Sequence, residues 1–298
     1  NIQTIDNIKR ITGAEFPFYQ YDCCCKEDMT KIFKQNDIES VIHFAGLKAV
    51  GESVEQPLKY YENNLQSTLL LCEVMKENDC NRLVFSSSAT VYGSPKTVPI
   101  KENFPLSATN PYGSTKLMIE RILSDICTSN PNFSVAALRY FNPIGAHKSA
   151  LIGELPNGIP NNLMPYITQV AAGKLKCLNV FGNDYDTHDG TGVRDYIHVV
   201  DLAKGHIKAL KYTRNHSGYE PFNLGTGTGY SVLDIIHAFE KTNKVKIPYK
   251  IVDRRPGDIA ICYADISKSK KILSWQAELS LEDMCKSSWE FTKKAFNN

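Results

Sequence analysis

The segments L-V-F-S-S-S-A-T-V-Y-G (83–93) and N-P-Y-G-S-T-K (110–116) decide the fold of this chain. The first predicts a buried strand that ends in a run of three serines. The second predicts a helix that begins at Pro111, where the missing N–H of proline costs nothing. Tyr112 and Lys116 are four residues apart, so they lie on one face of that helix.

A helical tyrosine and lysine beside a serine are suited to removing a proton from an alcohol. The reference pKa of tyrosine is about 10, which makes it a poor base at neutral pH. A nearby lysine ammonium favours the phenolate and lowers that pKa toward the working range. A serine hydroxyl can hold the oxygen whose proton moves. We therefore expect Tyr112, Lys116 and Ser88 to be catalytic, deprotonating an alcohol while a hydride leaves its carbon.

A second pair with the same spacing, Tyr92 and Lys96, serves as an internal control. The intervening residues are Gly93, Ser94 and Pro95, and a proline inside the turn excludes a regular helix. We expect this second pair to lie in a loop. Tyr-x-x-x-Lys alone fits an exposed helical pair as well as a site, so the preceding serine run is what favours a site.

Strands and helices alternate along the first half of the chain. Strands are predicted at 16–21, 39–46, 82–88 and 135–141, and helices at 27–36, 57–77 and 111–127; residues 1–12 are a helix end or a loop. The apolar stretch 39–46 ends in small residues, as a parallel strand beneath a nucleotide should. This alternation predicts a doubly wound, Rossmann-like α/β fold with ligands at the carboxyl ends of the strands.

The composition changes after Phe141. Residues 143–192 are rich in glycine, proline and asparagine around a helix at 164–173, which predicts a loop-rich α/β substrate domain. Further strands and helices are expected at 193–199, 201–212 and 232–241. We expect 1–142 to form an incomplete nucleotide-binding domain, with 193–215 packing back on it. The smaller domain then comprises 143–192 and 216–298.

Several long motifs resemble those of the extended short-chain dehydrogenase/reductase superfamily, and of its UDP-galactose 4-epimerase family in particular. They are H-F-A-G-L-K-A-V-G-E-S (43–53), S-S-S-A-T-V-Y-G (86–93), L-R-Y-F-N-P-I-G-A-H (138–147), G-I-P-N-N-L-M-P-Y (158–166) and G-T-G-V-R-D-Y-I-H-V (190–199). They follow one order and cover nearly the whole chain from about Phe16. The resemblance implies an isomerase that interconverts UDP-galactose and UDP-glucose at carbon 4 with bound NAD, through a transient 4-keto sugar.

The resemblance also implies a set of cofactor-binding residues. Asp22 and Cys23 fall at the adenine edge, residues 44–48 along the pyrophosphate and ribose, and Lys116 at the nicotinamide ribose. The full set is Asp22, Cys23, Phe44, Ala45, Gly46, Leu47, Lys48, Asn63, Ser88, Tyr112, Lys116 and Phe141. His43 lies inside an apolar strand, so we expect it to be a core residue.

A second implied set binds the UDP-hexose substrate. It comprises Lys48, Ser88, Tyr112, Asn142, Asn162, Leu163, Asn179, Val180, Phe181, Arg194, Arg255, Asp258 and Cys262. Guanidinium groups such as those of Arg194, Arg254 and Arg255 bind phosphate oxygens through two parallel hydrogen bonds. From the residues alone, R-R-P-G-D (254–258) also reads as an exposed loop, and the asparagines and aromatics as turn and core residues.

Position 262 bears on the range of substrates. In the family that the chain resembles, tyrosine at this position goes with restriction to plain hexoses, and a small residue with acceptance of N-acetylhexosamines. Cys262 leaves room for an acetamido group. The resemblance therefore implies that UDP-GlcNAc and UDP-GalNAc are also interconverted.

One family feature has no counterpart in this sequence. The family carries a Gly-x-x-Gly-x-x-Gly turn after its first strand, so we expect the chain to lack the first two strands, about 35–40 residues. The run G-T-G-T-G (225–229) has another spacing and comes too late, so we expect a structural turn, with Gly229 or Ser231 capping the helix that follows. A silent UDP-sugar-binding remnant without its cofactor cradle stays open as an alternative.

Nucleotide-sugar dehydratases are the nearest rival within the superfamily. They carry Asp-Glu directly after the serine or threonine run. Ala89 and Thr90 stand there in this chain, and neither side chain can shuttle the proton that eliminating water requires. We therefore exclude a dehydratase.

The composition narrows the remaining classes. The 298 residues are 42% hydrophobic and 22% charged with a net charge of +2, as in a soluble globular protein without a basic stripe for nucleic acid. No apolar run approaches the ~20 residues that span a membrane, and no signal peptide opens the chain. Nine cysteines without Cys-x-x-Cys are expected to be free thiols in a reducing, cytoplasmic compartment.

Two expectations concern partners. Seven histidines occur without the spacing of metal ligands, so we expect no metal site. The resemblance implies a homodimer that pairs through the helices at 57–77 and 111–127.

Overall fold

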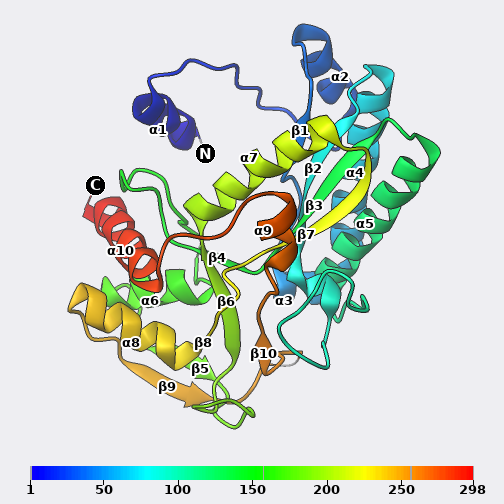
Figure 1. Ribbon diagram of the computed structural model, residues 1–298. Coiled ribbons are helices and arrows are strands. Elements are labelled where there is room, and N and C mark those ends of the chain that lie inside the picture. Colours follow the sequence, from blue (N-terminus) through cyan, green and yellow to red (C-terminus); the bar gives the residue numbers. More distant parts are fainter. Residues whose placement is uncertain (1, 157, 256, 298) are drawn as a thin grey trace.

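The structure is a computed structural model that describes residues 2–156, 158–255 and 257–297. Figure 1 shows a parallel sheet between layers of helices, and beside it a second group of elements that contains α6, α8, α10, β5 and β9. The N-terminal helix α1 (Ile2–Thr12) lies apart from the sheet. It contacts the rest of the chain where the Asn7 amide donates a hydrogen bond of 3.0 Å to the Leu151 carbonyl.

The first sheet has the strand order β1-β2-β3-β7, and every neighbouring pair is parallel. Its strands are β1 (Val41–His43), β2 (Arg82–Ser88), β3 (Ser134–Tyr140) and β7 (Gly218–Leu224). The carboxyl ends of these strands therefore meet at one edge, where ligands bind in folds of this kind.

Alternate residues of these strands pack into two separate hydrophobic cores, one on each face of the sheet. Leu83 and Phe85 face α4 (Pro57–Glu77) and α5 (Pro111–Ser129) on one side of the sheet. Val84 faces α7 (Val199–Asn215) on the other side. This period-two burial explains why the strands read as almost continuously apolar.

The second group surrounds a sheet of order β10-β6-β4, with β8 added antiparallel to β6. These strands are β4 (Asn142–Ile144), β6 (Val193–His198), β8 (Gly229–Ser231) and β10 (Ile261–Cys262), and β5 (Leu178–Phe181) pairs separately with β9 (Tyr249–Val252). The helices α6 (Leu163–Ala171), α8 (Val232–Asn243) and α10 (Leu281–Asn297) share a core with them. The short elements α2 (Lys26–Gln35), α3 (Val50–Glu55), η1 (Ala89–Tyr92) and α9 (Ser267–Ile272) complete the described part of the chain.

Most of the predicted elements are confirmed. The helices predicted at 27–36, 57–77, 111–127, 164–173, 201–212 and 232–241 are α2, α4, α5, α6, α7 and α8, and the strands predicted at 39–46, 82–88, 135–141 and 193–199 are β1, β2, β3 and β6. The N-terminal segment 1–12 is helical from Ile2 onward. The Ser231 hydroxyl caps α8 by accepting from the Asp234 N–H, and the Ser231 N–H donates to the Asp234 carboxylate in return. The G-T-G-T-G run is therefore a structural turn.

The strand predicted at 16–21 is wrong. This segment is irregular, and no described strand pairs with it. A strand is stable only beside a neighbour that receives its backbone hydrogen bonds. Among the described residues β1 pairs with β2 alone, and residues 16–21 do not pair with its outer edge.

The domain division predicted for residues 193–298 needs a correction. The predicted division puts residues 218–224 in the substrate domain, but β7 pairs with β3 and belongs to the first sheet. It also puts residues 193–198 with the first domain, but β6 joins the second sheet. Helix α7 does pack on β2 and β3, as expected. Strand pairing is a tertiary choice, and the apolar pattern of one strand does not identify its neighbour.

Candidate functional site

The serine run forms the carboxyl end of β2. Ser87 is buried, and Ser88 at the very end is half-buried. The Ser88 hydroxyl accepts a hydrogen bond of 3.2 Å from the Thr90 N–H, which caps the 3-10 helix η1. Strand and cap together hold the Ser88 side chain at the edge where ligands bind.

The helix α5 begins as the sequence predicts. The Asn110 side chain accepts from the Gly113 N–H at 2.8 Å, and Pro111 occupies the first helical position. Tyr112 and Lys116 follow on one face, with the Lys116 Nζ 5.9 Å from the centre of the Tyr112 ring. The predicted pair is therefore brought together beside Ser88, whose side chain hydrogen-bonds to Tyr112.

The Lys116 side chain is buried against the end of β2, beside Tyr112 and Ser88. It is 4% exposed, its Nζ donates 2.7 Å to the Ser86 carbonyl, and the Phe85 ring centre lies 4.9 Å away. This single carbonyl contact leaves further N–H donors of the ammonium for other partners.

The electrostatics of the pair differ from the sequence-based expectation. Burial raises the pKa of Tyr112, and the hydrogen bond with Ser88 acts in the opposite direction. Burial lowers the pKa of Lys116 to about 8, opposed by the charge of Glu120. The chain's own groups thus raise rather than lower the Tyr112 pKa, because desolvation of the phenol outweighs the hydrogen bond with Ser88.

The predicted cofactor residues 44–48 follow β1 directly. Phe44 is 58% exposed, and its ring lies 4.8 Å from that of His206. Gly46 has φ +151°, and a Cβ there would lie 3.2 Å from the Asn64 side-chain oxygen. Ala45, Leu47 and Lys48 alternate between half-buried and exposed along this segment.

Asn64, which the sequence analysis missed, organises this segment. Its side-chain oxygen accepts 2.7 Å from the Leu47 N–H, and its amide donates to the Leu47 carbonyl and to Thr115 on α5. It is 1% exposed, on the stripe of α4 that also buries Tyr60 and Leu71. A polar residue on the buried stripe of an amphipathic helix is the signal that could have identified it.

The remaining predicted cofactor residues lie near the same edge. Asp22 is exposed and accepts from the Cys24 N–H at 2.8 Å, and Cys23 is half-buried with a pKa raised by burial and by Asp22. The Asn63 carbonyl contacts the Cys24 thiol at 3.5 Å, which brings α4 to this loop. Phe141 is buried beyond β3. His43 is a core residue, as predicted: it is 4% exposed and hydrogen-bonds to Thr68.

A second cluster gathers the predicted UDP residues of the other sheet. The Arg255 guanidinium lies 4.7 Å from the centre of the Phe181 ring, and its Nε donates 3.0 Å to Asp258. Arg194 pairs in register with Cys262, and its Nη1 donates 2.9 Å to its neighbour's carbonyl. Cys262 is 8% exposed, and burial raises its pKa to about 11.

Four predicted substrate residues are placed differently from one another. Asn142 and Asn162 are exposed, and Leu163 and Asn179 are half-buried. Val180 is 1% exposed inside the core with α6 and α8, so its side chain is structural and leaves only its backbone for a ligand.

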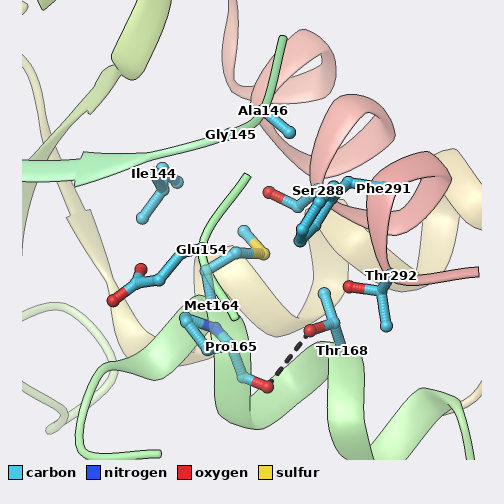
Figure 2. Close-up of a pocket in the computed structure, with 10 residues that line it drawn as sticks. All are labelled: Ile144, Gly145, Ala146, Glu154, Met164, Pro165, Thr168, Ser288, Phe291 and Thr292. Carbon is cyan, nitrogen blue, oxygen red and sulfur yellow. Dashed lines mark hydrogen bonds between the residues drawn. The ribbon is translucent and has the colours of Figure 1, made fainter. Parts of the chain in front are cut away.

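A small pocket adjoins Asn162 and Leu163. Figure 2 shows Glu154, Met164, Phe291 and Thr292 among the residues that line it. The Glu154 carboxylate accepts 2.9 Å from the Asn162 amide and lies 3.6 Å from the Lys48 ammonium. Three residues from distant parts of the chain therefore meet at Glu154, two of them predicted substrate residues.

The buried Asp195 links this cluster to the G-T-G-T-G turn. Its carboxylate accepts from the Thr226 N–H and hydroxyl and from the Gly227 and Ala264 N–H groups, at 2.7–3.1 Å. A side chain on Gly225 would collide with the same carboxylate. The turn therefore binds an aspartate of the protein, in keeping with a structural role.

The control pair Tyr92–Lys96 lies outside the site. Tyr92 ends η1, and a Cβ on Gly93 would lie 1.7 Å from the Ser107 carbonyl oxygen, so only glycine fits and no helix continues toward Lys96. The Tyr92 hydroxyl is buried, donates 2.6 Å to Asn223 and accepts 2.9 Å from Arg139. Tyr92 is thus a structural residue.

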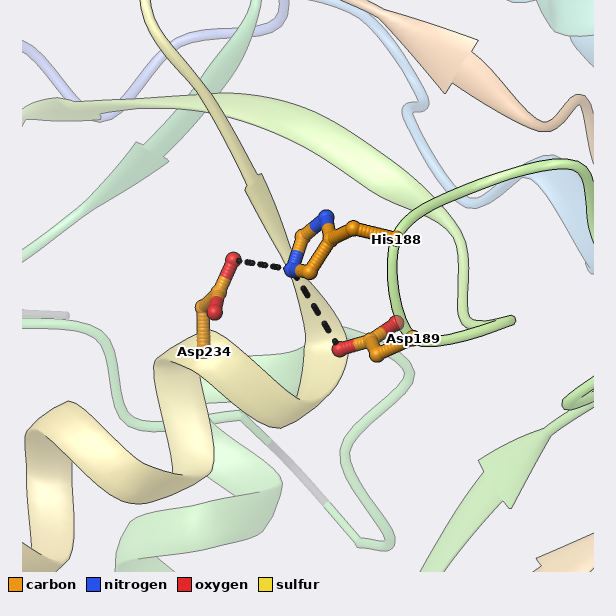
Figure 3. A group of neighbouring side chains, drawn as sticks. All are labelled: His188, Asp189 and Asp234. Atoms are coloured by element: carbon orange, nitrogen blue, oxygen red, sulfur yellow. Dashed lines mark ion pairs between the residues drawn. The ribbon is translucent and has the colours of Figure 1, made fainter.

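One group of side chains, His188, Asp189 and Asp234, has the residue types and spacing that could hold a metal ion. His188 lies 3.2 Å from the Asp234 carboxylate and 3.7 Å from that of Asp189, as Figure 3 shows. Both carboxylates already accept hydrogen bonds, Asp234 from the Ser231 N–H and Asp189 from the Thr191 N–H. These contacts attach the loop before β6 to the start of α8.

Comparison with known proteins identifies the class. Over residues 1–288 the chain matches the profile of the family described as GDP-mannose 4,6 dehydratase. Together with the parallel sheet and the Tyr-x-x-x-Lys helix, this match makes the chain an extended short-chain dehydrogenase/reductase. Among the described residues, no helix is long and apolar enough to cross a membrane.

Closer relatives narrow the assignment. A UDP-glucose 4-epimerase from Bacillus subtilis is 59% identical over 295 residues, 99% of this chain and 87% of the relative. The UDP-glucose 4-epimerase structure from Bifidobacterium longum, in complex with NAD+ and UDP, has a TM-score of 0.94 and 54% identity over 98% of this chain and 87% of its own. That from Stenotrophomonas maltophila, with bound NAD and formylated UDP-arabinopyranose, has a TM-score of 0.98 and 47% identity over 100% and 88%. The chain belongs to the UDP-glucose 4-epimerase family.

Proposed function

We propose that this protein is an NAD-dependent isomerase that interconverts UDP-galactose and UDP-glucose by inverting carbon 4 of the hexose. The observation that carries the proposal is the Tyr112–Lys116 pair beside Ser88, at the carboxyl edge of a parallel sheet, in a chain of the UDP-glucose 4-epimerase family. The UDP-bound and NAD-bound relatives support the same substrate class and cofactor.

The residues at this edge fit a dinucleotide. The Lys116 ammonium donates to one carbonyl only among the described residues, Phe44 presents an exposed aromatic ring, and Gly46 permits close approach of a ligand to the backbone. Residues 44–48, Asn63, Asp22, Cys23 and Phe141 complete the proposed cradle. NAD held by these residues would supply the hydride acceptor and donor for carbon 4.

The catalytic residues divide the proton chemistry among them. Tyr112, as phenolate, takes the proton from the hydroxyl on carbon 4, and Ser88 donates a hydrogen bond to that oxygen as it becomes a ketone. Lys116 stabilises the phenolate by its charge. The 4-keto sugar then presents its opposite face, Tyr112 returns the proton to the oxygen, and the configuration is inverted.

The substrate is held by its nucleotide rather than by its sugar. Arg194 and Arg255 neutralise the diphosphate, Phe181 stacks on the base, and Asp258 accepts hydrogen bonds from the ribose. A loosely held sugar attached to firmly bound UDP can rotate between the two hydride steps and present its opposite face. This division of contacts distinguishes an epimerase from an enzyme that must keep one face of the sugar in place.

The dehydratase reading is not favoured, although the matching family profile carries that description. Ala89 and Thr90 occupy η1 where an acid pair would be required, and the Thr90 hydroxyl is buried without a hydrogen-bond partner among the described residues. The silent UDP-sugar-binding remnant is not favoured either, because Ser88, Tyr112 and Lys116 keep a mutual geometry that binding alone does not require.

The proposed substrate range includes the N-acetylhexosamines. Cys262 lies in β10 beside Arg194, and its small side chain leaves space for an acetamido group. We expect Cys262→Tyr to abolish turnover of UDP-GalNAc while retaining that of UDP-galactose, and Cys262→Ser to retain both. A wild-type enzyme that acts on UDP-galactose but not on UDP-GalNAc would contradict this extension.

Two further parts of the proposal concern the cellular context. The exposed apolar side chains Leu58 and Leu69 on α4 and Met118 on α5 support a homodimer formed through these helices. The nine free cysteines support a reducing, cytoplasmic location. Light scattering of the purified protein tests the dimer directly.

The experiment that tests the function measures bound cofactor and turnover in one preparation. The purified protein is denatured and the released NAD per chain is measured, and a parallel sample is assayed for conversion of UDP-galactose to UDP-glucose. Bound NAD with turnover supports the proposal. Protein that is loaded with NAD but inactive on every UDP-hexose would refute it in favour of a silent binding protein.

A further inference from the structure

One buried ion pair lies behind the proposed catalytic residues, and the mechanism above does not use it. Glu120 on α5 is 3% exposed and Arg139 on β3 is 2% exposed. The Arg139 Nη2 donates 2.7 Å to one carboxylate oxygen of Glu120, and its Nε donates 3.0 Å to the other. Both N–H···O contacts run in parallel, the geometry that fixes a carboxylate most firmly.

The carboxylate is connected to the site in two ways. Glu120 follows Lys116 by four residues, so both side chains lie on one face of α5. Glu120 also accepts a hydrogen bond from the Ser87 hydroxyl. Ser87 stands between Ser86, whose carbonyl receives the Lys116 ammonium at 2.7 Å, and Ser88, which hydrogen-bonds to Tyr112. One carboxylate therefore contacts both elements that carry the catalytic group.

Stability alone does not account for such a pair. Removing two charges from water offsets most of their attraction, and apolar residues of similar size commonly stabilise a core as well. The pair also has a direct electrostatic effect on the site, because the charge of Glu120 opposes the effect of burial on Lys116.

We propose that Glu120 is a positioning residue of this active site: its buried carboxylate keeps Lys116 protonated and, through Ser87, holds the end of β2 that presents Ser86 and Ser88. Arg139 fixes the Glu120 carboxylate through the two parallel hydrogen bonds. The guanidinium is fixed in turn by the Glu102 carbonyl and the Tyr92 hydroxyl, each at 2.9 Å. The inference rests on the proposed function for the role of Lys116, but its central claim concerns the ionisation of one amine and is measurable without turnover.

Other titratable groups surround this network. His43 on β1 and Tyr112 on α5 lie near Lys116, and Tyr92 in η1 and Tyr219 on β7 lie near Glu120. Tyr60 on α4 and Tyr140 on β3 lie near Tyr112, and Glu102 lies near Arg139. Burial lowers the pKa of His43 to about 4, so it is neutral at working pH. Burial raises the pKa of Tyr60, Tyr92, Tyr140 and Tyr219, so these four are neutral as well. Tyr112 carries a negative charge only as the proposed phenolate. Burial also raises the pKa of Glu102, whose carboxylate already accepts from the Asn223 N–H.

The test follows the Lys116 amine by NMR of protein labelled with ¹³C-lysine, with its resonance assigned by its absence in Lys116→Met. In Glu120→Gln we expect the titration midpoint to fall by about 1 pH unit or more relative to wild type. Arg139→Lys is the matched variant, because it breaks the parallel hydrogen bonds but keeps both charges. Its midpoint should stay within a few tenths of a unit of wild type, about 0.3.

Two further variants keep the result unambiguous. Asp125→Asn removes a carboxylate from the exposed face of the same helix and should leave the midpoint unchanged. If Glu120→Gln does not fold, the double variant Glu120→Leu with Arg139→Met leaves no unpaired buried charge and should still lower the midpoint. Equal midpoints in wild type, Glu120→Gln and the double variant would overturn the proposal and leave the pair a purely structural one.

Turnover supplies the second readout. Glu120→Gln should lower kcat with UDP-galactose at least about tenfold, leave KM within about twofold and displace the pH profile of kcat. A loss of stability alone would reduce the amount of active enzyme without displacing this profile. Wild-type protein without epimerase activity would refute the proposed function, yet the Lys116 titration would still decide the role of Glu120. The two ideas therefore fail separately.

Discussion

The two Tyr-x-x-x-Lys pairs of this chain allow a matched test of the catalytic assignment. Tyr112→Phe and Tyr92→Phe each delete one phenolic oxygen from a tyrosine four residues before a lysine. We expect the first to abolish turnover without unfolding the protein, and the second to destabilise the protein without affecting the chemistry.

The structure sets the size of each effect. Positioned proton transfer contributes roughly 10²–10⁴-fold, so Tyr112→Phe should lower kcat by that factor. Among the described residues the Tyr112 hydroxyl hydrogen-bonds to Ser88, so the free energy of unfolding should change by about 1 kcal/mol or less. Tyr92→Phe leaves the buried Asn223 oxygen without its 2.6 Å donor and removes one acceptor of Arg139. An unsatisfied buried group costs about 1–3 kcal/mol, so a loss of about 2–4 kcal/mol is expected.

The assays are initial-rate conversion of UDP-galactose and thermal unfolding of the same preparations. At roughly 2–4 °C per kcal/mol, Tyr92→Phe should melt about 5–15 °C lower while its kcat per folded molecule stays within about twofold of wild type. Tyr112→Phe should melt within about 3 °C of wild type. Comparable turnover in Tyr112→Phe and wild type would refute the assignment of Tyr112 as the base, and unchanged melting of Tyr92→Phe would refute its structural role.

Four further predictions concern other parts of the molecule. Lys116 has a pKa of about 8 in the folded protein against an ordinary value of 10.5, so the unfolded chain binds more protons between these two pH values. The free energy of unfolding should therefore rise from about pH 8 to 10.5, and a denaturant titration of Lys116→Met should no longer show this rise. His43 has a folded pKa of about 4 against 6.5, so stability should fall by about 3 kcal/mol as the pH drops through this window, and His43→Gln should flatten the fall. Asp195→Asn keeps one acceptor oxygen and loses about two of four charged hydrogen bonds, so unfolding should become about 3 kcal/mol easier by urea titration. Arg255→Ala should weaken UDP binding about tenfold or more in calorimetry with kcat changed less than about threefold, and an unchanged dissociation constant would remove Arg255 from the nucleotide site.

Local signals predicted the elements that carry the proposed catalytic group. Pro111 with a capping Asn110 marks the start of α5, and the apolar run before three serines marks β2, because both signals depend on residues close in sequence. The position of Tyr112 on the same face of α5 as Lys116 follows from helical spacing alone. These parts of the site could be read before any tertiary contact was known.

The parts that sequence reasoning missed depend on neighbours distant in the chain. Residues 16–21 have a strand-like pattern but no described partner, and the pattern of β7 does not reveal that β3 is its neighbour. The direction of the Tyr112 pKa depends on how completely other segments enclose the ring, which spacing does not report. Asn64 and Glu120 have detectable signals, since each is a polar residue on the buried stripe of its helix.

The path of the chain between the two sheets has a consequence for folding. After β3 the chain enters the second sheet as β4, returns to it as β6, and only then completes the first sheet with β7, which lies against β3 along its whole length. Neither the first sheet with its helices nor the second is formed by one contiguous segment. A cut in the chain between them therefore removes a strand or a covering helix from one of the two. The two halves should therefore unfold in one cooperative transition, and limited proteolysis should yield no stable fragment that retains only the cofactor half or only the nucleotide-sugar half.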